Sequence, residues 1–131
     1  MISHLFSTPI YVSDQDSAVD FYVNKLGFEL RADEPMGPSA RWIMVAPKGA
    51  QTCLTLYKPT PEMPGAETYE AATARIGRFT GAIFDTPDIQ ATYRELSARG
   101  VPFAEPPAQQ PWGWWATFSD PDGNSFGLGQ H

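Results

Sequence analysis

The spacing of apolar and polar residues divides the chain into strand-like and helix-like segments. Residues 5–12 (LFSTPIYV) mix β-branched and aromatic residues around Pro9. This composition predicts a strand at a sheet edge, where the missing backbone donor of proline does no harm. From Asp16 the period changes to that of a helix. The apolar face of this helix consists of Val19, Tyr22, Val23 and Leu26.

The predicted helix has end signals on both sides. Ser13 and Asp16 have the spacing of a capping box, and Gly27 stands where a left-handed C-terminal cap belongs. Asp14, Asp16 and Asp20 form a carboxylate cluster at the helix start. At that place we expect the carboxylates to cap the helix and to complement its dipole.

Three strand-like runs follow the helix, at residues 28–31, 41–46 and 52–57. Turn-forming residues separate them at 35–38 (PMGP) and 47–49 (PKG). The first half of the chain is therefore predicted to have the order βαβββ.

A proline-rich segment, residues 58–65 (KPTPEMPG), interrupts this pattern and predicts irregular structure. Residues 67–75 predict a short helix. The order of elements then begins again, which makes this segment a linker.

The second half of the chain repeats the first. A strand is predicted at residues 80–85, and a helix starts at the N-cap residue Asp88 and stops at Gly100. The apolar face of this helix consists of Ile89, Tyr93 and Leu96. Strands are predicted at residues 101–104, 114–119 and 125–128.

The repetition predicts the architecture, because two copies of about 55 residues must each form the same unit. We expect an α+β fold with two βαβββ modules, in a single domain spanning residues 1–131. The modules cover residues of about 4–58 and 78–130, and a linker at 59–77 joins them.

Composition limits the partners. A net charge of −6 disfavours nucleic acid, whose binding depends on Lys and Arg. The chain has one cysteine, Cys53, so it has no internal disulfide and suits a reducing compartment. The start (MISHLFSTPIYVSD) does not resemble a secretory signal, and no run reaches the ~18 apolar residues of a membrane span. We therefore expect a cytoplasmic protein with neither a nucleic-acid nor a membrane partner.

Two motifs suggest a family. The first comprises Val12-Ser13-Asp14, Ala18, Phe21-Tyr22 and Leu26-Gly27-Phe28, and the second runs from Phe118 to Asn124. With the duplicated βαβββ order, they resemble the vicinal oxygen chelate superfamily, which includes glyoxalase I, bleomycin-resistance proteins and extradiol dioxygenases. This resemblance implies a cup-shaped mixed sheet with helices packed on its outer face, and a homodimer.

Metalloenzymes of this superfamily hold a divalent ion inside the cup through four residues, usually two His or Gln and two Glu. The resemblance places these positions at Ser7, at Cys53 or Leu54, at Gly81 and at Gly127. None of these residues is a histidine or a carboxylate, and one hydroxyl with one thiol would not hold a divalent ion against water. We therefore expect no metal and no cofactor.

Other candidates for chemistry have simpler explanations. His4 is three residues before Ser7 and should point to the opposite face of an extended strand, while the terminal His131 should be frayed. Cys53 has no histidine placed to activate it, so we expect a buried structural thiol. Residues 120–124 (DPDGN) lack the spacing of a calcium loop and predict a turn between the last two strands.

The absent metal ligands leave a cavity whose wall follows from strand alternation. The side chains predicted to face it and bind a ligand are Ser7, Tyr11, Trp42, Met44, Cys53, Thr55, Tyr57, Trp115, Thr117 and Gly127. Phe118 and Phe126 should instead pack against the second helix. Aromatic walls with a few hydroxyls and space beside the glycines favour a small planar or aromatic ligand. The tryptophans would equally suit a core or a dimer interface.

The preferred interpretation is a metal-free, small-molecule binding protein of the glyoxalase/bleomycin-resistance type. One alternative is a glyoxalase-like lyase or isomerase, or a dioxygenase-like enzyme, with a divalent metal at a non-standard site or with residues such as Tyr11, Tyr57 and Glu70. Another is an interaction subunit. The sequence assigns no catalytic residue.

Overall fold

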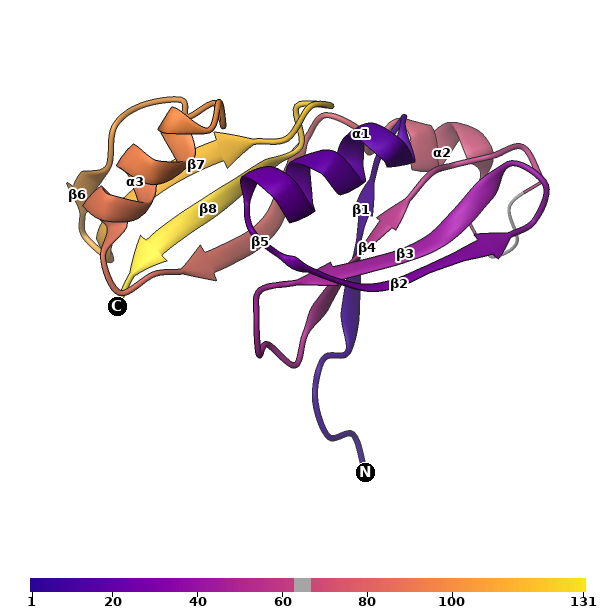
Figure 1. Ribbon diagram of the computed structural model, residues 1–131, viewed down its shortest axis with the longest axis horizontal. Coiled ribbons are helices and arrows are strands. Elements are labelled where there is room, and N and C mark those ends of the chain that lie inside the picture. The colour runs from indigo at the N-terminus through magenta and orange to yellow at the C-terminus, as the bar shows by residue number, and fades with distance from the viewer. Residues whose placement is uncertain (63–66) are drawn as a thin grey trace. The chain divides into compact units, whose positions relative to one another are not determined.

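The computed structural model describes residues 1–62 and 67–131 and divides into two compact units, Met1–Ile76 and Gly77–His131 (Figure 1). Each unit has a four-stranded mixed sheet. This confirms the predicted α+β class with βαβββ modules. Residues 63–66 of the predicted linker lie outside the described residues. Among the residues that are described, no helix is long and apolar enough to cross a membrane.

The first unit contains β1 (Ser7–Tyr11), α1 (Gln15–Val19), the π-helical η1 (Asp20–Lys25), β2 (Glu29–Met36), β3 (Ala40–Ala46), β4 (Cys53–Tyr57) and α2 (Tyr69–Thr73). Its strand order is β1-β4-β3-β2. β1 runs parallel to β4, and the other neighbours are antiparallel. Pro9 therefore lies on an edge strand, as predicted.

The helix after β1 begins differently from the prediction. Its N-cap is Asp14, whose carboxylate accepts a hydrogen bond from the Ser17 amide at 3.1 Å. The capping box of Ser13 and Asp16 was therefore wrong, because Asp14 provides the side-chain cap. Gly27 follows the helix with a φ of 78°, which confirms the predicted left-handed cap.

The helix-covered face of the first sheet forms the core of this unit (Figure 1). Its buried side chains are Ile10, Val12, Ile43, Val45, Leu54 and Leu56 from the strands and Ala18, Phe21 and Tyr22 from the helices. Burying a large aliphatic or aromatic side chain contributes roughly 1.5–3 kcal/mol relative to leaving it in water. The helices α1 and η1 do not cover the opposite face of this sheet.

Gln15 is a buried polar residue in this core, with 5% of its surface exposed. Its amide nitrogen donates to the backbone oxygens of Arg41 at 2.7 Å and Leu56 at 2.9 Å. Its amide oxygen accepts from the Arg41 amide at 3.0 Å. The side chain thus joins β3 to β4 beyond the Met44–Thr55 and Val45–Leu54 pairs of the ladder.

The second unit contains β5 (Phe79–Asp85), α3 (Ile89–Ala98), β6 (Ala108–Gln110), β7 (Gly113–Ser119) and β8 (Ser125–Gln130). Its strand order is β5-β8-β7-β6. Asp88 caps α3 by accepting from the Ala91 amide at 3.0 Å, as predicted. Gly100 follows the helix with a φ of 89°.

Aromatic rings fill the space between α3 and the second sheet. Phe84 lies 6.0 Å from Phe118 and 5.3 Å from Phe126 between ring centroids. Phe103 lies 5.7 Å from Phe118 and 4.9 Å from Tyr93, a residue of α3. Phe118 and Phe126 therefore belong to the core on the helix side, as the alternation predicted.

Two strand predictions were wrong. Residues 101–104 form no strand, and only an isolated bridge links Phe103 to Phe118. The edge strand is instead β6, which lies in a proline-rich stretch and pairs with β7 at the end of the strand order. An edge strand tolerates neighbouring prolines, because one row of its backbone donors is unpaired. Similarly, Pro35 and Met36 belong to β2, so the turn before β3 is shorter than predicted.

The predicted turn at residues 120–124 is confirmed. The Asp120 carboxylate accepts from the backbone amides of Asp122 and Asn124, each at 2.9 Å, and from the Asn124 side-chain amide at 2.8 Å. The Asn124 side-chain oxygen accepts from the Gly77 amide at 2.8 Å. The turn therefore joins the start of β8 to the residues that lead into β5.

Candidate ligand-binding faces

The face of the first sheet that α1 and η1 do not cover, here called the first open face, carries seven predicted site residues. In the strand register, Ser7 is opposite Cys53, Tyr11 is opposite Tyr57, and Met44 is opposite Thr55. Strand alternation then places Ser7, Tyr11, Trp42, Met44, Cys53, Thr55 and Tyr57 on this face. Leu54 points into the core, so Cys53 is the residue of that pair that lies beside Ser7.

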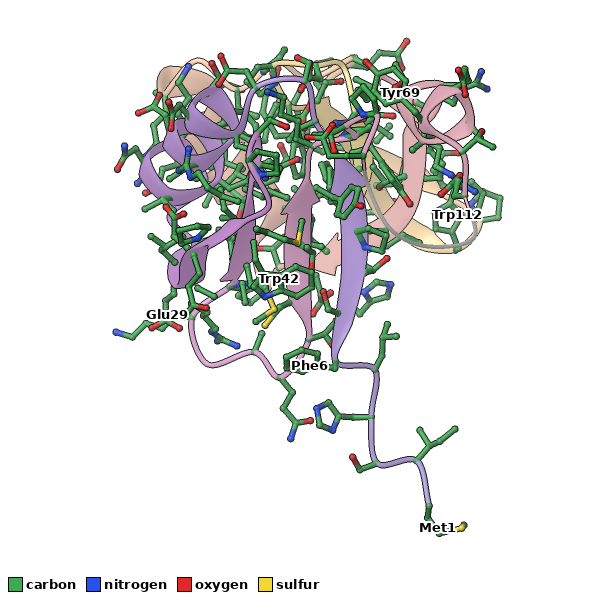
Figure 2. All side chains as sticks on the ribbon, turned by 90° about the vertical axis from the view of Figure 1, so that its right-hand side faces the viewer. Met1, Phe6, Glu29, Trp42, Tyr69 and Trp112 are labelled. Atoms are coloured by element: carbon green, nitrogen blue, oxygen red, sulfur yellow. The ribbon has the colours of Figure 1, made fainter. Side chains whose placement is uncertain are left out.

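Direct contacts link several of these side chains. The hydroxyl oxygens of Ser7 and Thr55 are 2.5 Å apart. The rings of Tyr11 and Tyr57 meet edge to face, with centroids 5.8 Å apart. Trp42, labelled in Figure 2, is half-buried on the first sheet. The same figure shows the N-terminal residues leaving that sheet near Phe6 and extending to Met1. The first open face thus combines a hydroxyl pair with aromatic surface.

Tyr11 is held in place by residues outside the sheet. Its hydroxyl donates to Glu67 at 3.1 Å, and the same carboxylate accepts from Arg75 at 2.5 Å. The Arg75 guanidinium carbon lies 5.6 Å from the centre of the Tyr11 ring. Together these contacts fix the Tyr11 ring next to Tyr57.

The protonation of this group follows from its surroundings. Burial raises the pKa of Tyr11 above its usual value of 10.0, and the hydrogen bond to Glu67 raises it further. The hydrogen bond from Arg75 lowers the pKa of Glu67 below its usual 4.5. At neutral pH Tyr11 is therefore a hydrogen-bond donor and Glu67 an anion.

Glu67, rather than the proposed Glu70, is the carboxylate that contacts Tyr11. Glu70 lies in the first turn of α2 and is exposed. Sequence reasoning missed Glu67 because it placed this residue inside a helix, whereas α2 begins later, after the N-cap Thr68. Thr68 was the available signal, because a favoured N-cap residue directly before α2 places Glu67 outside the helix.

Cys53 is buried, with 3% of its surface exposed, as predicted. A cation nevertheless lies beside it, because a guanidinium nitrogen of Arg31 is 3.6 Å from its sulfur. Arg31 also donates to the backbone oxygen of Ala50 at 2.5 Å. Alternation alone did not reveal this neighbour, since the register of β2 shifts between Leu30 and Ala32.

The uncovered face of the second sheet, here called the second open face, carries the other predicted residues. Trp115 is opposite Gly129, and Thr117 is opposite Gly127. The Trp115 ring lies directly over Gly127, where an added Cβ would stand 2.1 Å from Cη2. The space expected beside Gly127 is therefore filled by Trp115, and that expectation was wrong.

His131 is not frayed as predicted. Its Nδ1 is 2.7 Å from a carboxylate oxygen of Asp85, although 62% of its side chain is exposed. Its ring covers Gly129, whose added Cβ would be 2.8 Å from Cε1.

Residues 1–62 and 67–131 contain no group of three or more His, Cys, Asp or Glu side chains placed to hold a metal ion.

Described residues of the first unit line cavities near the β2–β3 turn. The hairpin cavity has a volume of about 210 Å³ and is lined by Met36, Gly37, Pro38, Ala40, Tyr57, Lys58, Thr60 and Glu62. The polar cavity, of about 510 Å³, is lined by residues that include Asp14, Asp16, Arg41 and Lys58. Arg41 is already bound to Asp16 at 2.6 Å and to Asp33 at 3.0 Å. In the polar cavity the positive charge of Arg41 is therefore already neutralised by these carboxylates.

Two βαβββ units, each with one helix-covered and one open sheet face, define the class to which the chain belongs. The chain is a member of the Glyoxalase/Bleomycin resistance protein/Dioxygenase superfamily, whose sequence model matches residues 2–128. The resemblance inferred from the two sequence motifs is thereby confirmed.

Individual relatives resemble nearly the whole chain. A crystal structure of a superfamily member from Sphaerobacter thermophilus DSM 20745 shares 42% identity, with a TM-score of 0.84, over 99% of this chain and 98% of that one. TnmS3, an antibiotic binding protein from Streptomyces sp. CB03234, shares 44% identity, with a TM-score of 0.78, over 98% and 96%. The uncharacterized protein YetH of Bacillus subtilis (strain 168) is 40% identical over 96% of this chain and 97% of its own length.

Proposed function

We propose that the chain is a metal-free protein that binds a small planar or aromatic molecule. The observation that carries this proposal is the first open face, where the half-buried rings of Tyr11, Trp42 and Tyr57 share one side of the sheet with the Ser7–Thr55 hydroxyl pair. Flat aromatic surface with few polar groups is typical of small-molecule sites. The similarity to TnmS3, an antibiotic binding protein, supports small-molecule binding.

The proposal gives the side chains separate tasks. The rings of Trp42 and Tyr57 supply apolar contact area to a planar ligand, and the hydroxyls of Ser7 and Thr55 supply its polar contacts. On the second open face, Trp115 and Thr117 offer the same pair of chemistries. Ser7, Cys53 and Gly127 bring no carboxylate or imidazole to the positions where superfamily metalloenzymes bind their ion, which favours binding without a metal.

Quenching of the protein's tryptophan fluorescence by planar probes tests this function. We expect 2-naphthol, chromone and acridine to bind saturably, with at least one of them giving a dissociation constant that calorimetry can measure. Trp42→Leu should weaken that binding about fivefold, because aromatic contacts contribute about 1 kcal/mol beyond area burial.

The matched control is Trp114→Leu. Trp114 precedes Trp115 on β7 and therefore points to the opposite face of its strand. This variant should leave probe binding within twofold of wild type. Absence of saturable binding by all three probes would contradict the proposal. So would stoichiometric metal in the purified protein together with turnover of the methylglyoxal–glutathione hemithioacetal, because that pair of results favours the glyoxalase-like enzyme.

We also propose that the protein acts as a cytoplasmic homodimer. The second unit exposes two large apolar side chains of β5, Phe79 at 56% and Ile83 at 57%, and large exposed apolar groups are typical of surfaces that pair. The free thiol of Cys53 suits a reducing compartment. Light scattering should give twice the 14.4 kDa mass of one chain. Ile83→Asp should shift the mass toward one chain, and a wild-type protein that scatters as a monomer would exclude the dimer.

A further inference from the structure

The hairpin cavity continues the first open face. Met36 pairs with Ala40 and Glu34 pairs with Trp42 across β2 and β3, so alternation places Met36 and Ala40 on the same side as Trp42. Tyr57, which contacts Tyr11 on that face, also lines the cavity. A ligand that lies against Tyr57 therefore has the cavity next to it.

The segment after β4 closes the cavity from one side. Thr60 is buried, with 7% of its surface exposed. The Ser39 hydroxyl in the β2–β3 turn donates a hydrogen bond to the Glu62 carboxylate, and this bond lowers the pKa of Glu62. The turn and this segment thus hold each other across the cavity.

We propose that the hairpin cavity is a subsite for one uncharged six-membered ring carried as a substituent on the planar ligand. Its volume of about 210 Å³ exceeds that of the apolar cavities, on the order of 150 Å³, that take up a benzene molecule. Met36, Pro38, Ala40 and Tyr57 give it an apolar lining. Lys58 and Glu62 bring one positive and one negative charge to the lining, which therefore has no net charge and suits a neutral ring better than an ion.

This inference rests on the proposed function, and one pair of probes separates the two. Chromone is a planar bicycle, and flavone is chromone with one added phenyl ring. Flavone should bind the wild-type protein at least tenfold more tightly than chromone in calorimetry. Ala40→Leu fills the cavity and should remove this advantage while leaving chromone affinity within twofold of wild type. Ser39→Ala, which loses the bond to Glu62, should reduce the advantage without changing the affinity for chromone.

The control is Ala98→Leu, the same substitution at an exposed position at the end of α3, and it should preserve the flavone advantage. Equal affinities of chromone and flavone for the wild-type protein would overturn the subsite and leave the proposed function intact. An advantage that persists in Ala40→Leu would do the same. Failure of both probes to bind would count against the proposed function itself.

Discussion

Replacing Asp120 with alanine should destabilise the protein by at least about 3 kcal/mol, because a buried carboxylate that accepts at least three hydrogen bonds is lost. Asp120 has 4% and Asn124 has 1% of its surface exposed. Water therefore cannot readily replace the missing oxygens, and the amides of Asp122 and Asn124 remain unsatisfied. The effect should extend to Gly77, whose amide donates to the Asn124 side chain. In thermal denaturation, the melting temperature should fall by about 10 °C or more.

Asp88→Ala provides the matched control, since Asp88 accepts one hydrogen bond as the N-cap of α3. Loss of a cap costs about 1 kcal/mol, so the Asp120 variant should lose clearly more stability. Asp120→Asn should be intermediate, because an amide oxygen can still accept the two backbone hydrogen bonds. If urea denaturation gave equal losses of unfolding free energy for Asp120→Ala and Asp88→Ala, the hydrogen bonds of Asp120 would not stabilise the protein more than a single helix cap does.

The family motif around this turn shows which features the sequence could predict. Pro121 and Gly123 signal a turn through their backbone preferences, and both are local properties. The period of two likewise predicted which side chains of a strand share a face, because alternation follows from strand geometry alone. For the same reason, Ser7, Thr55 and Tyr57 were assigned to one face before their contacts were known. The period of 3.6 was less accurate: of the face predicted for the first helix only Tyr22 is buried, and Ala18 and Phe21 are buried beside it.

Features that depend on distant neighbours were not predictable in this way. The interaction of Tyr11 with Glu67 joins residues 56 positions apart, and nothing in either segment specifies the other. Arg31 reaches Cys53 at a shift in strand register, which periodicity does not detect. The strand β6 is three residues long and lies at a sheet edge, where it pairs with β7. Its sequence, Ala108 to Gln110, is too short to show apolar alternation.

Gly127 illustrates the difference between an absent side chain and an empty space. The sequence shows that no donor group stands there, but only the packing shows that Trp115 occupies the volume. We expect Gly127→Ala to force the ring away, since the new Cβ would lie 2.1 Å from Cη2, 2.6 Å from Cζ2 and 2.9 Å from Cζ3 of Trp115. Overpacking of this kind costs about 1–3 kcal/mol.

Two readouts follow from this displacement. The midpoint of urea denaturation should fall, and the tryptophan emission should shift to longer wavelength, because the Trp115 ring moves into water. Gly129→Ala is the control on the same strand, where the new Cβ meets the exposed ring of His131, which can swing away. That variant should be close to neutral. Gly127→Ala combined with Trp115→Leu should recover part of the lost stability, since the shorter side chain leaves room for the methyl group. Wild-type stability and emission in Gly127→Ala alone would show that Trp115 does not rest on Gly127 in solution.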